Sequence, residues 1–293
     1  MLFRSSALGE RDDIVRLHEL KLDAPPFYLE SDLAPHGNLL QWAERQGGLE
    51  KIPLAQRIAL VAHTATALAA AHSIGVLHKD IKPTNILIFD GPGGEPRPRL
   101  VDFGIGTLAD PGVLAQHGVT GAGFTRATIQ HSTGTPTYSP PEYLAGKPYT
   151  IQGDIYGLGV LLYQLITAKP LDPIAPGWER DVSHPLLRED IAACVDGDPA
   201  RRLPSAADLA ERLLTLEERR AEISKKEQLA SEVKMRAEAE TAARAARDRY
   251  WRLRKFVGAF ALVTVTAIHS CMRAKENERK ADAASGGTSR PGR

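Results

Sequence analysis

Residues 78–85 read HKDIKPTN, and the rest of the chain is interpreted outward from this stretch. An apolar run with helical spacing, residues 58–72, comes before it, and two short hydrophobic segments after it end in Asp102-Phe103-Gly104. Gly134-Thr135 and Pro141-Glu142 follow in that order. Any one of these motifs would occur by chance in many chains, but the ordered set would not. The ordered set of motifs therefore indicates a single type of functional site.

The ordered motifs resemble the catalytic loop, the metal-binding strand and the substrate-facing loop of a protein kinase. The Lys-Pro pair after Asp80 resembles the serine/threonine type. The layout of an N-terminal kinase, a juxtamembrane segment and one apolar span resembles bacterial membrane-anchored serine/threonine kinases. The resemblance implies transfer of the γ-phosphate of ATP to a protein hydroxyl, with Asp80 orienting that hydroxyl and taking its proton. Lys82 would direct its ammonium group toward the phosphate, and Asn85 and Asp102 would supply the hard oxygen ligands that Mg²⁺ prefers.

The segment between Asn85 and Asp102 brings these two distant side chains together. Residues 86–89 and 99–101 are predicted to be short strands, and residues 90–94, DGPGG, are a strong turn signal between them. A hairpin of this kind returns Asp102 to the neighbourhood of Asn85. One magnesium–nucleotide complex could then touch both side chains.

The first predicted strands lie near the start of the chain. Residues 13–20 alternate as a half-buried strand should, and residues 27–33 form a second strand that runs into a Pro/Gly loop. They resemble the last small-lobe strands and the hinge of a kinase. That resemblance implies nucleotide contacts from the backbone of Glu30 and Asp32 and from Leu87. The alternative is a pair of ordinary strands with no ligand role.

The resemblance also assigns supporting residues. Thr135 would form a hydrogen bond close to the catalytic aspartate. Glu142 would pair with a buried arginine, which is Arg202 or, as the alternative, Arg201. Asp154 would hold the backbone of the catalytic loop, although it could equally be an ordinary carboxylate at a helix N-terminus. Structural roles beside the catalytic loop fall to His78, Phe103 and Gly104.

A kinase small lobe should begin with a glycine-rich loop, a strand carrying an ATP-binding lysine, and a helix with a partner glutamate. About ten residues precede the first predicted strand, and the glycine clusters at residues 91–94 and 118–123 do not lie between a strand and a helix. We expect a true start upstream of Met1 or a truncated gene; a genuine degenerate product is the alternative. Catalysis by the chain as it stands is expected to be impaired, and a membrane-tethered pseudokinase or binding scaffold is the alternative function.

The composition of the chain argues against a nucleic-acid-binding protein and against a disulfide or metal framework. The chain has 293 residues and a formal net charge of +1, so no strongly basic balance favours nucleic acid. Cys194 and Cys271 are widely separated and lack the spacing of a metal site or a disulfide framework. We predict an α+β, protein-kinase-like fold, with a remnant of the small lobe and the hinge in residues 1–34 and a mostly helical large lobe in residues 35–215.

The predicted large lobe contains a long helix and a long polar loop. Residues 54–73 are expected to form a long helix that ends near Gly75, on which His63 and His72 are predicted to be packing or surface residues. Residues 105–139 have the composition of an activation loop. Its candidate phosphorylation sites, which could equally be solvated loop hydroxyls, are Thr120, Thr125, Thr128, Ser132 and Thr133.

The amino-acid composition changes in the C-terminal part of the chain. Residues 216–255 are rich in Ala, Glu, Lys and Arg and are predicted to form a solvated juxtamembrane helix. The alternative is a coiled coil, which would make the chain a homodimer. Residues 256–272 carry no formal charge and follow Tyr250, Trp251 and a basic flank, a pattern typical of a single transmembrane helix.

A buried or interfacial helix is the alternative for residues 256–272. Residues 273–293 are predicted to be a disordered tail. Because the chemistry requires ATP, the kinase lobe is expected on the cytoplasmic side of the inner membrane, where its partners would be protein substrates.

Overall fold

The computed structural model describes residues 11–21, 26, 28–103 and 136–285. The chain divides into two units, Met1–Arg220 and Ala221–Arg293. The helices are α2 (Leu39–Arg45), α3 (Leu54–Ser73), α7 (Pro141–Leu144), α8 (Ile151–Thr167), α9 (Pro185–Val195), α10 (Ala206–Leu214) and α11 (Leu216–Ser285). The strands are β1 (Leu17–Lys21), β2 (Tyr28–Ser31), β3 (Ile86–Asp90) and β4 (Pro96–Leu100).

The strands form two antiparallel hairpins, β1–β2 and β3–β4. The sequence predicts one strand over residues 13–20, and the structure corrects this. The N–H of Val15 donates to the carbonyl of Leu100 at 2.9 Å, and the N–H of Leu100 donates to the carbonyl of Asp13 at 3.0 Å. The first half of the predicted strand therefore joins β4, while β1 starts only at Leu17 and pairs with β2. The chain changes partner because Val15 is buried whereas Leu17 is exposed.

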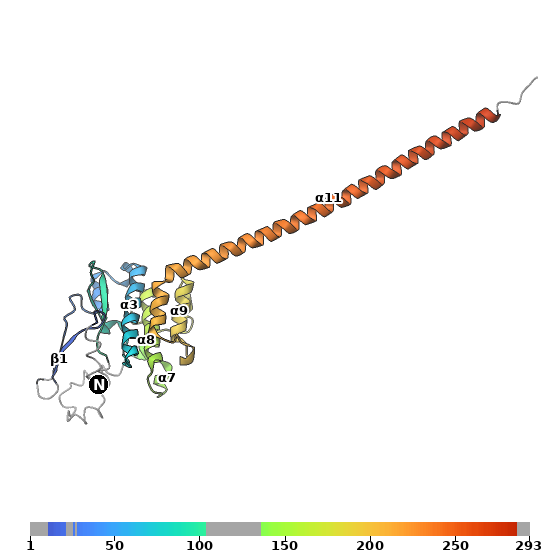
Figure 1. Cartoon of the computed structure of the whole chain (residues 1–293). Coiled ribbons are helices and arrows are strands. Elements are labelled where there is room, and N and C mark those ends of the chain that lie inside the picture. Colours follow the sequence, from blue (N-terminus) through green and yellow to red (C-terminus); the bar gives the residue numbers. More distant parts are fainter. Residues whose placement is uncertain (1–10, 22–25, 27, 104–135, 286–293) are drawn as a thin grey trace, which may run out of the picture. The chain divides into compact units, whose positions relative to one another are not determined.

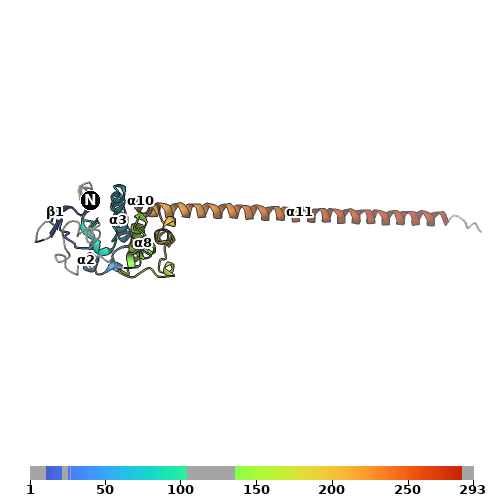
Figure 2. The same cartoon turned by 90° about the horizontal axis from the view of Figure 1, so that it is seen from below.

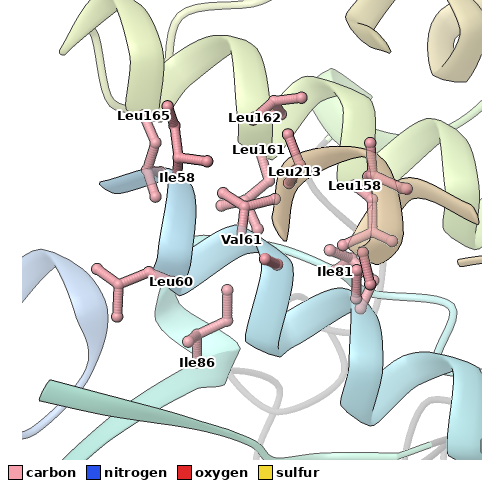
Figure 3. Packing of buried hydrophobic residues seen from close by; sticks show 14 of the residues in the cluster. Ile58, Leu60, Val61, Ile81, Ile86, Leu158, Leu161, Leu162, Leu165 and Leu213 are labelled. Atoms are coloured by element: carbon pink, nitrogen blue, oxygen red, sulfur yellow. The ribbon is translucent and has the colours of Figure 1, made fainter. Parts of the chain in front are cut away.

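The core of the first unit is built around α3 (Figures 1 and 2), which packs against α8 on one side and α10 on another. Figure 3 shows Ile58 and Val61 of α3 facing Leu161 and Leu165 of α8, with Leu213 of α10 closing the cluster. All five side chains are buried. Truncating one such side chain to alanine typically costs about 2–5 kcal/mol, so these contacts fix the position of α3 and of the loop that follows it.

α3 has the bounds that the sequence predicts, and its end has a clear cause. Gly75 has a φ of +75°, its N–H donates to His72, and the N–H of Val76 donates to Ala71. This pair of hydrogen bonds is a Schellman motif, which ends a helix by using a residue in the left-handed conformation. The chain leaves the helix there and runs directly into the HKDIKPTN loop.

α11 is a single helix from Leu216 to Ser285, so it passes through residues 256–272 without a break. The predicted disordered tail is wrong for residues 273–285, which are helical because they lack Gly and Pro and carry the i,i+4 pair Glu276–Lys280. Among the described residues, α3 and α11 are long and apolar enough to cross a membrane. Half of that window in α3 is buried in the core, whereas none of that in α11 is buried.

Candidate active site

The catalytic loop places three of the predicted residues in direct contact. The Lys82 ammonium lies 2.6 Å from Oδ2 of Asp80, and Nδ2 of Asn85 donates to the same oxygen at 3.0 Å and to the Asp80 carbonyl at 2.9 Å. Pro83–Asn85 forms one turn of 3-10 helix that turns the asparagine back toward the aspartate. Within the described chain, Oδ1 of Asp80 is left without a hydrogen-bond partner. That oxygen can accept a hydrogen bond from a bound molecule.

The buried side chain of His78 supports the catalytic loop. It is 1 % exposed, its Nε2 lies 2.9 Å from the carbonyl of Val101, and its ring is 4.8 Å from that of Phe103. The N–H of Asp80 points at its Nδ1 at 3.3 Å. Burial lowers the pKa of His78, and nearby carboxylates offset this only in part. The ring is therefore neutral, donating through Nε2 and accepting through Nδ1.

The β3–β4 hairpin returns Asp102 to the catalytic loop. The N–H of Val101 donates to the carbonyl of Asn85 at 3.1 Å, so the next residue lies beside the loop. Asp102 has a φ of +66° and Lys79 has a φ of +70°, a backbone conformation that residues other than glycine rarely adopt. Such strained positions cluster at functional sites.

Burial and the charged groups of the catalytic loop shift the pKa of Asp102. Desolvation raises the pKa of its carboxyl, as does the charge of Asp80, while His78 and Lys82 act in the opposite direction. A bound cation would favour the ionised form of this carboxylate.

The residues fit a magnesium ion held together with a nucleotide. Because Nδ2 of Asn85 faces Asp80, its amide oxygen is left as the atom that can bind a cation. Asp102 adds a carboxylate, and both are hard oxygen ligands. Over the described ranges no group of three or more His, Cys, Asp or Glu side chains could hold a metal. A site with so few protein ligands suits Mg²⁺, which commonly takes further ligands from phosphates and water.

Asp154, in the first turn of α8, holds the loop from the other side and is fully buried. Its Oδ2 accepts the N–H of His78 at 2.8 Å, and its Oδ1 accepts that of Lys79 at 2.7 Å. Nε2 of His72 and the hydroxyl of Tyr149 also contact it, at 2.8 and 3.1 Å. An ordinary carboxylate at a helix N-terminus would not gather partners from α3 and the catalytic loop.

Sequence reasoning missed the roles of His72 and Tyr149. His72 was expected to be a packing or surface residue, but it is nearly buried and in contact with Asp154, 82 residues further along the chain. No spacing in the sequence signals a contact across that separation. Tyr149, whose pKa burial raises, lies just before the helix that carries its partner.

Two glycines let α8 approach its neighbours closely enough for these contacts. A Cβ on Gly157 would lie 3.1 Å from Cβ of Ile81 in the catalytic loop. A Cβ on Gly159 would lie 2.5 Å from Cβ of Cys194 in α9, which is closer than real atoms pack. Gly157 therefore permits the close approach of α8 to the loop, and Gly159 permits that of α8 to α9.

Glu142 and Arg202 form a bidentate pair, with Nη1 at 2.7 Å from Oε1 and Nη2 at 2.8 Å from Oε2. The Arg202 side chain is fully buried, and its Nη1 also donates to the carbonyl of Gln152. Burial alone would raise the pKa of Glu142, but the hydrogen bonds and charge of Arg202 outweigh it and lower that pKa. Arg201 is exposed and instead pairs with Asp196 at 3.2 Å.

The predicted hinge agrees less well with the structure. The N–H of Asp32 donates to the carbonyl of Arg16 at 3.0 Å, so the prediction that it faces an adenine is wrong for this donor. This hydrogen bond lies one residue beyond the paired ends of β1 and β2 and occupies the Asp32 N–H. Glu30 lies in the exposed β2 strand. Leu87 is half-buried in β3 and forms a bridge with Asn38, at the end of the hinge segment.

Several predicted residues lie outside the described part of the chain. These are Gly104, Thr135 and the candidate phosphorylation sites at residues 120–133.

Comparison with known proteins gives a consistent result. The profile of the protein kinase domain matches residues 5–235. The chain is 35% identical over 221 residues to serine/threonine-protein kinase PkaA of Streptomyces coelicolor, an alignment that covers 70% of this chain and 37% of that protein.

Two further relatives carry similar names. Identity is 32% over 230 residues to serine/threonine-protein kinase PkaB of the same organism, covering 73% of this chain and 51% of the relative. It is 37% over 176 residues to serine/threonine-protein kinase PknJ of Mycobacterium tuberculosis, covering 53% and 28%. The chain thus spans about half or less of the length of these curated relatives.

Proposed function

The chain belongs to the protein kinase family, of the bacterial serine/threonine type, and from that premise we propose that it transfers the γ-phosphate of ATP to serine or threonine hydroxyls of proteins. The single observation that carries the proposal is the contact set of Asp80, Lys82 and Asn85, with Asp102 returned beside it. All the chemical groups of the catalytic loop are in place, which favours an enzyme over a scaffold without catalysis.

Asp80 is the proposed catalytic base. Lys82 and Asn85 both contact its Oδ2 and so fix the carboxylate, leaving Oδ1 to accept the proton of the acceptor hydroxyl. General base catalysis of this kind contributes about 10²–10⁴-fold to a rate. Lys82, which is largely shielded from water, would stabilise the charge on the transferred phosphoryl oxygens.

Asn85 and Asp102 would hold Mg²⁺ on the phosphates of ATP, which neutralises charge as it develops there. Leu87 and the backbone of Glu30 would contact the nucleotide, and Thr135 would order the substrate side of the site. Asp154 would be a positioning residue, because it contacts the catalytic loop rather than the reacting atoms. Glu142 and Arg202 would hold the start of α7 in place through their ion pair.

We also propose the domain order that the sequence predicts, with the small-lobe remnant in residues 1–34, the large lobe in 35–215, a juxtamembrane helix in 216–255 and one membrane span in 256–272. The exposed apolar stretch of α11 supports the span. The kinase lobe would then lie on the cytoplasmic side of the inner membrane. The homodimer stays a prediction.

The test is phosphate transfer by the full chain, purified in detergent, to a general protein substrate such as casein. With Mg²⁺ and γ-labelled ATP we expect phosphoserine or phosphothreonine, lost on chelation of Mg²⁺. Asp102→Ala should abolish transfer and should also abolish the thermal shift produced by Mg²⁺-ATP. A wild-type chain that binds Mg²⁺-ATP but transfers no phosphate would overturn the enzyme in favour of the scaffold.

A further inference from the structure

A dense group of cationic side chains lies in α11 directly before the apolar segment 256–272. Residues 244–255 carry six cations against one carboxylate, a net charge of +5. The window of equal length after the segment, residues 273–284, carries four cations against three carboxylates, a net charge of +1. The window before the group, residues 232–243, carries two against three, a net charge of −1. The positive charge is therefore concentrated at one end of the apolar segment.

The helix gathers most of these cations on one face. Arg244, Arg247, Trp251 and Arg254 are spaced by three, four and three residues, and Lys255 follows Trp251 by four, so all five share a side of α11. We call these five residues the basic stripe. The Arg254 guanidinium lies 5.3 Å from the centre of the Trp251 ring, a cation–π contact that fixes the charge beside the aromatic ring.

Within the part of the chain that the structure describes, no cation of the basic stripe forms an ion pair. Charged pairs of α11 lie elsewhere along the helix, among them Arg219 with Asp190, Glu217 with Arg220, Glu222 with Lys226, and Glu276 with Lys280. Trp251 itself is 50% exposed. The stripe therefore presents uncompensated charge together with an amphipathic ring.

The length of the apolar segment determines where the stripe would lie. Seventeen helical residues rise about 26 Å, which is shorter than a hydrocarbon core of about 30 Å. A short span draws its flanking residues toward the interface, where tryptophan and arginine are favoured. Arg254 and Lys255, which adjoin the segment, would then lie among the phosphates of the headgroups.

We propose that the basic stripe binds the headgroups of anionic phospholipids in the leaflet that faces the kinase lobe. This inference rests on the proposed membrane span. A second copy of the chain is a poorer occupant, because a parallel neighbour would bring the same positive charges together. Clusters of four to eight Lys or Arg next to a span are attracted to anionic lipids through the surface potential.

The test uses the fluorescence of Trp251 in the full chain reconstituted into bilayers. Trp42 and Trp178 are buried in the first unit and should not meet lipid, and a Trp251→Phe variant gives their contribution. Brominated phosphatidylserine in phosphatidylcholine should quench Trp251 more strongly than brominated phosphatidylcholine in phosphatidylserine at equal mole fraction. We expect a preference of about fivefold at low salt, roughly the effect of one cation near the surface, which shrinks as salt is raised.

The decisive comparison is between two variants that each lose three positive charges. Arg244→Gln/Arg247→Gln/Arg254→Gln should remove the preference. The matched control beyond the span, Arg273→Gln/Lys275→Gln/Arg279→Gln, should keep it. A preference that survives the first change, or is lost equally in both, overturns the inference.

The remaining outcomes separate this inference from the proposed span. Equal quenching by the two brominated lipids would overturn lipid selectivity and leave the span standing. Quenching by neither would overturn both. A preference that appears or disappears with the ratio of protein to lipid would show that a second copy covers the stripe, and would also count against the inference.

Discussion

The first unit and the exposed part of α11 are each stabilised by a different kind of contact. In the first unit, buried charged groups join segments that are far apart in sequence: Asp154 contacts residues 76 and 82 positions away, and Arg202 contacts Glu142 at a separation of 60. From Ala221 onward, the Glu222–Lys226 and Glu276–Lys280 pairs of α11 join i,i+4 neighbours, and the described side chains are almost all exposed. Tertiary contacts define the site, whereas local propensity defines the helix.

The contacts of Asp190 are among the last buried tertiary contacts before α11 becomes exposed. Asp190 is fully buried in α9 and contacts Arg212 of α10 and Arg219 in the first turns of α11. Leu216, the first residue of α11, is still buried. Burial then ends within a few residues. Substitutions on either side of this point should therefore differ sharply in their effects, and the following predictions test that contrast.

The largest effect is expected at the catalytic base. Asp80→Asn removes the carboxylate that accepts the proton and should lower the rate of phosphate transfer by about 10²–10⁴-fold. The fold should persist, because the side chain is partly exposed and not in the core. Initial rates with labelled ATP measure this, with Glu222→Gln in α11 as the control that leaves the rate unchanged. A variant with near wild-type activity would remove Asp80 from the mechanism.

The next effect is on stability. Arg202→Leu leaves the nearly buried Glu142 carboxylate without its partner, and breaking such a pair costs about 3–5 kcal/mol. Urea unfolding of the full chain in detergent, followed by near-UV circular dichroism, measures the loss. Glu222→Gln breaks the exposed Glu222–Lys226 pair and should leave the unfolding midpoint unchanged. Equal losses in both variants would contradict the contrast between the two regions.

Asp154→Asn should have a smaller cost in stability with a larger effect on the rate. The amide replaces one of two acceptor oxygens with a donor that faces the N–H of either His78 or Lys79, which costs about 1–3 kcal/mol. Because these groups belong to the catalytic loop, kcat should fall while KM for ATP changes little. A fall in stability with no change in kcat would limit Asp154 to a structural role.

The smallest effect is a dependence on pH. Burial lowers the pKa of His78, so the folded chain keeps this ring neutral while the unfolded chain protonates it near its ordinary pKa of 6.5. The unfolded state then binds more protons as the pH falls through that value, and stability present above it is lost below it. We expect the free energy of unfolding to decrease from about pH 7.5 to about pH 5.5.

The matched variant for the pH effect is His78→Phe, which keeps the ring contact with Phe103 and cannot titrate. It should show a shallower pH dependence than the wild type. A slope identical to the wild type would mean that other groups cause it.

Local pattern was enough where the physical cause is local. Residues 54–73 were predicted as the helix that is found, because the apolar spacing and Gly75 act within a few residues. The turn signal also predicts the β3–β4 hairpin, although β4 is Pro96–Leu100 rather than the predicted residues 99–101. Residues 13–20 failed, since their alternating pattern cannot tell which neighbouring strand each half will join.

The sequence by itself determined the family and the helix over residues 54–73, because ordered motifs and helical propensity are written in neighbouring residues. The tertiary structure decided that Arg202 rather than Arg201 meets Glu142, that His72 joins Asp154, and that Asp32 uses its N–H at the end of the β1–β2 hairpin. These contacts depend on how α3, α8 and the strands pack. Packing depends on distances between residues that are far apart in the chain, and local sequence patterns do not specify those distances.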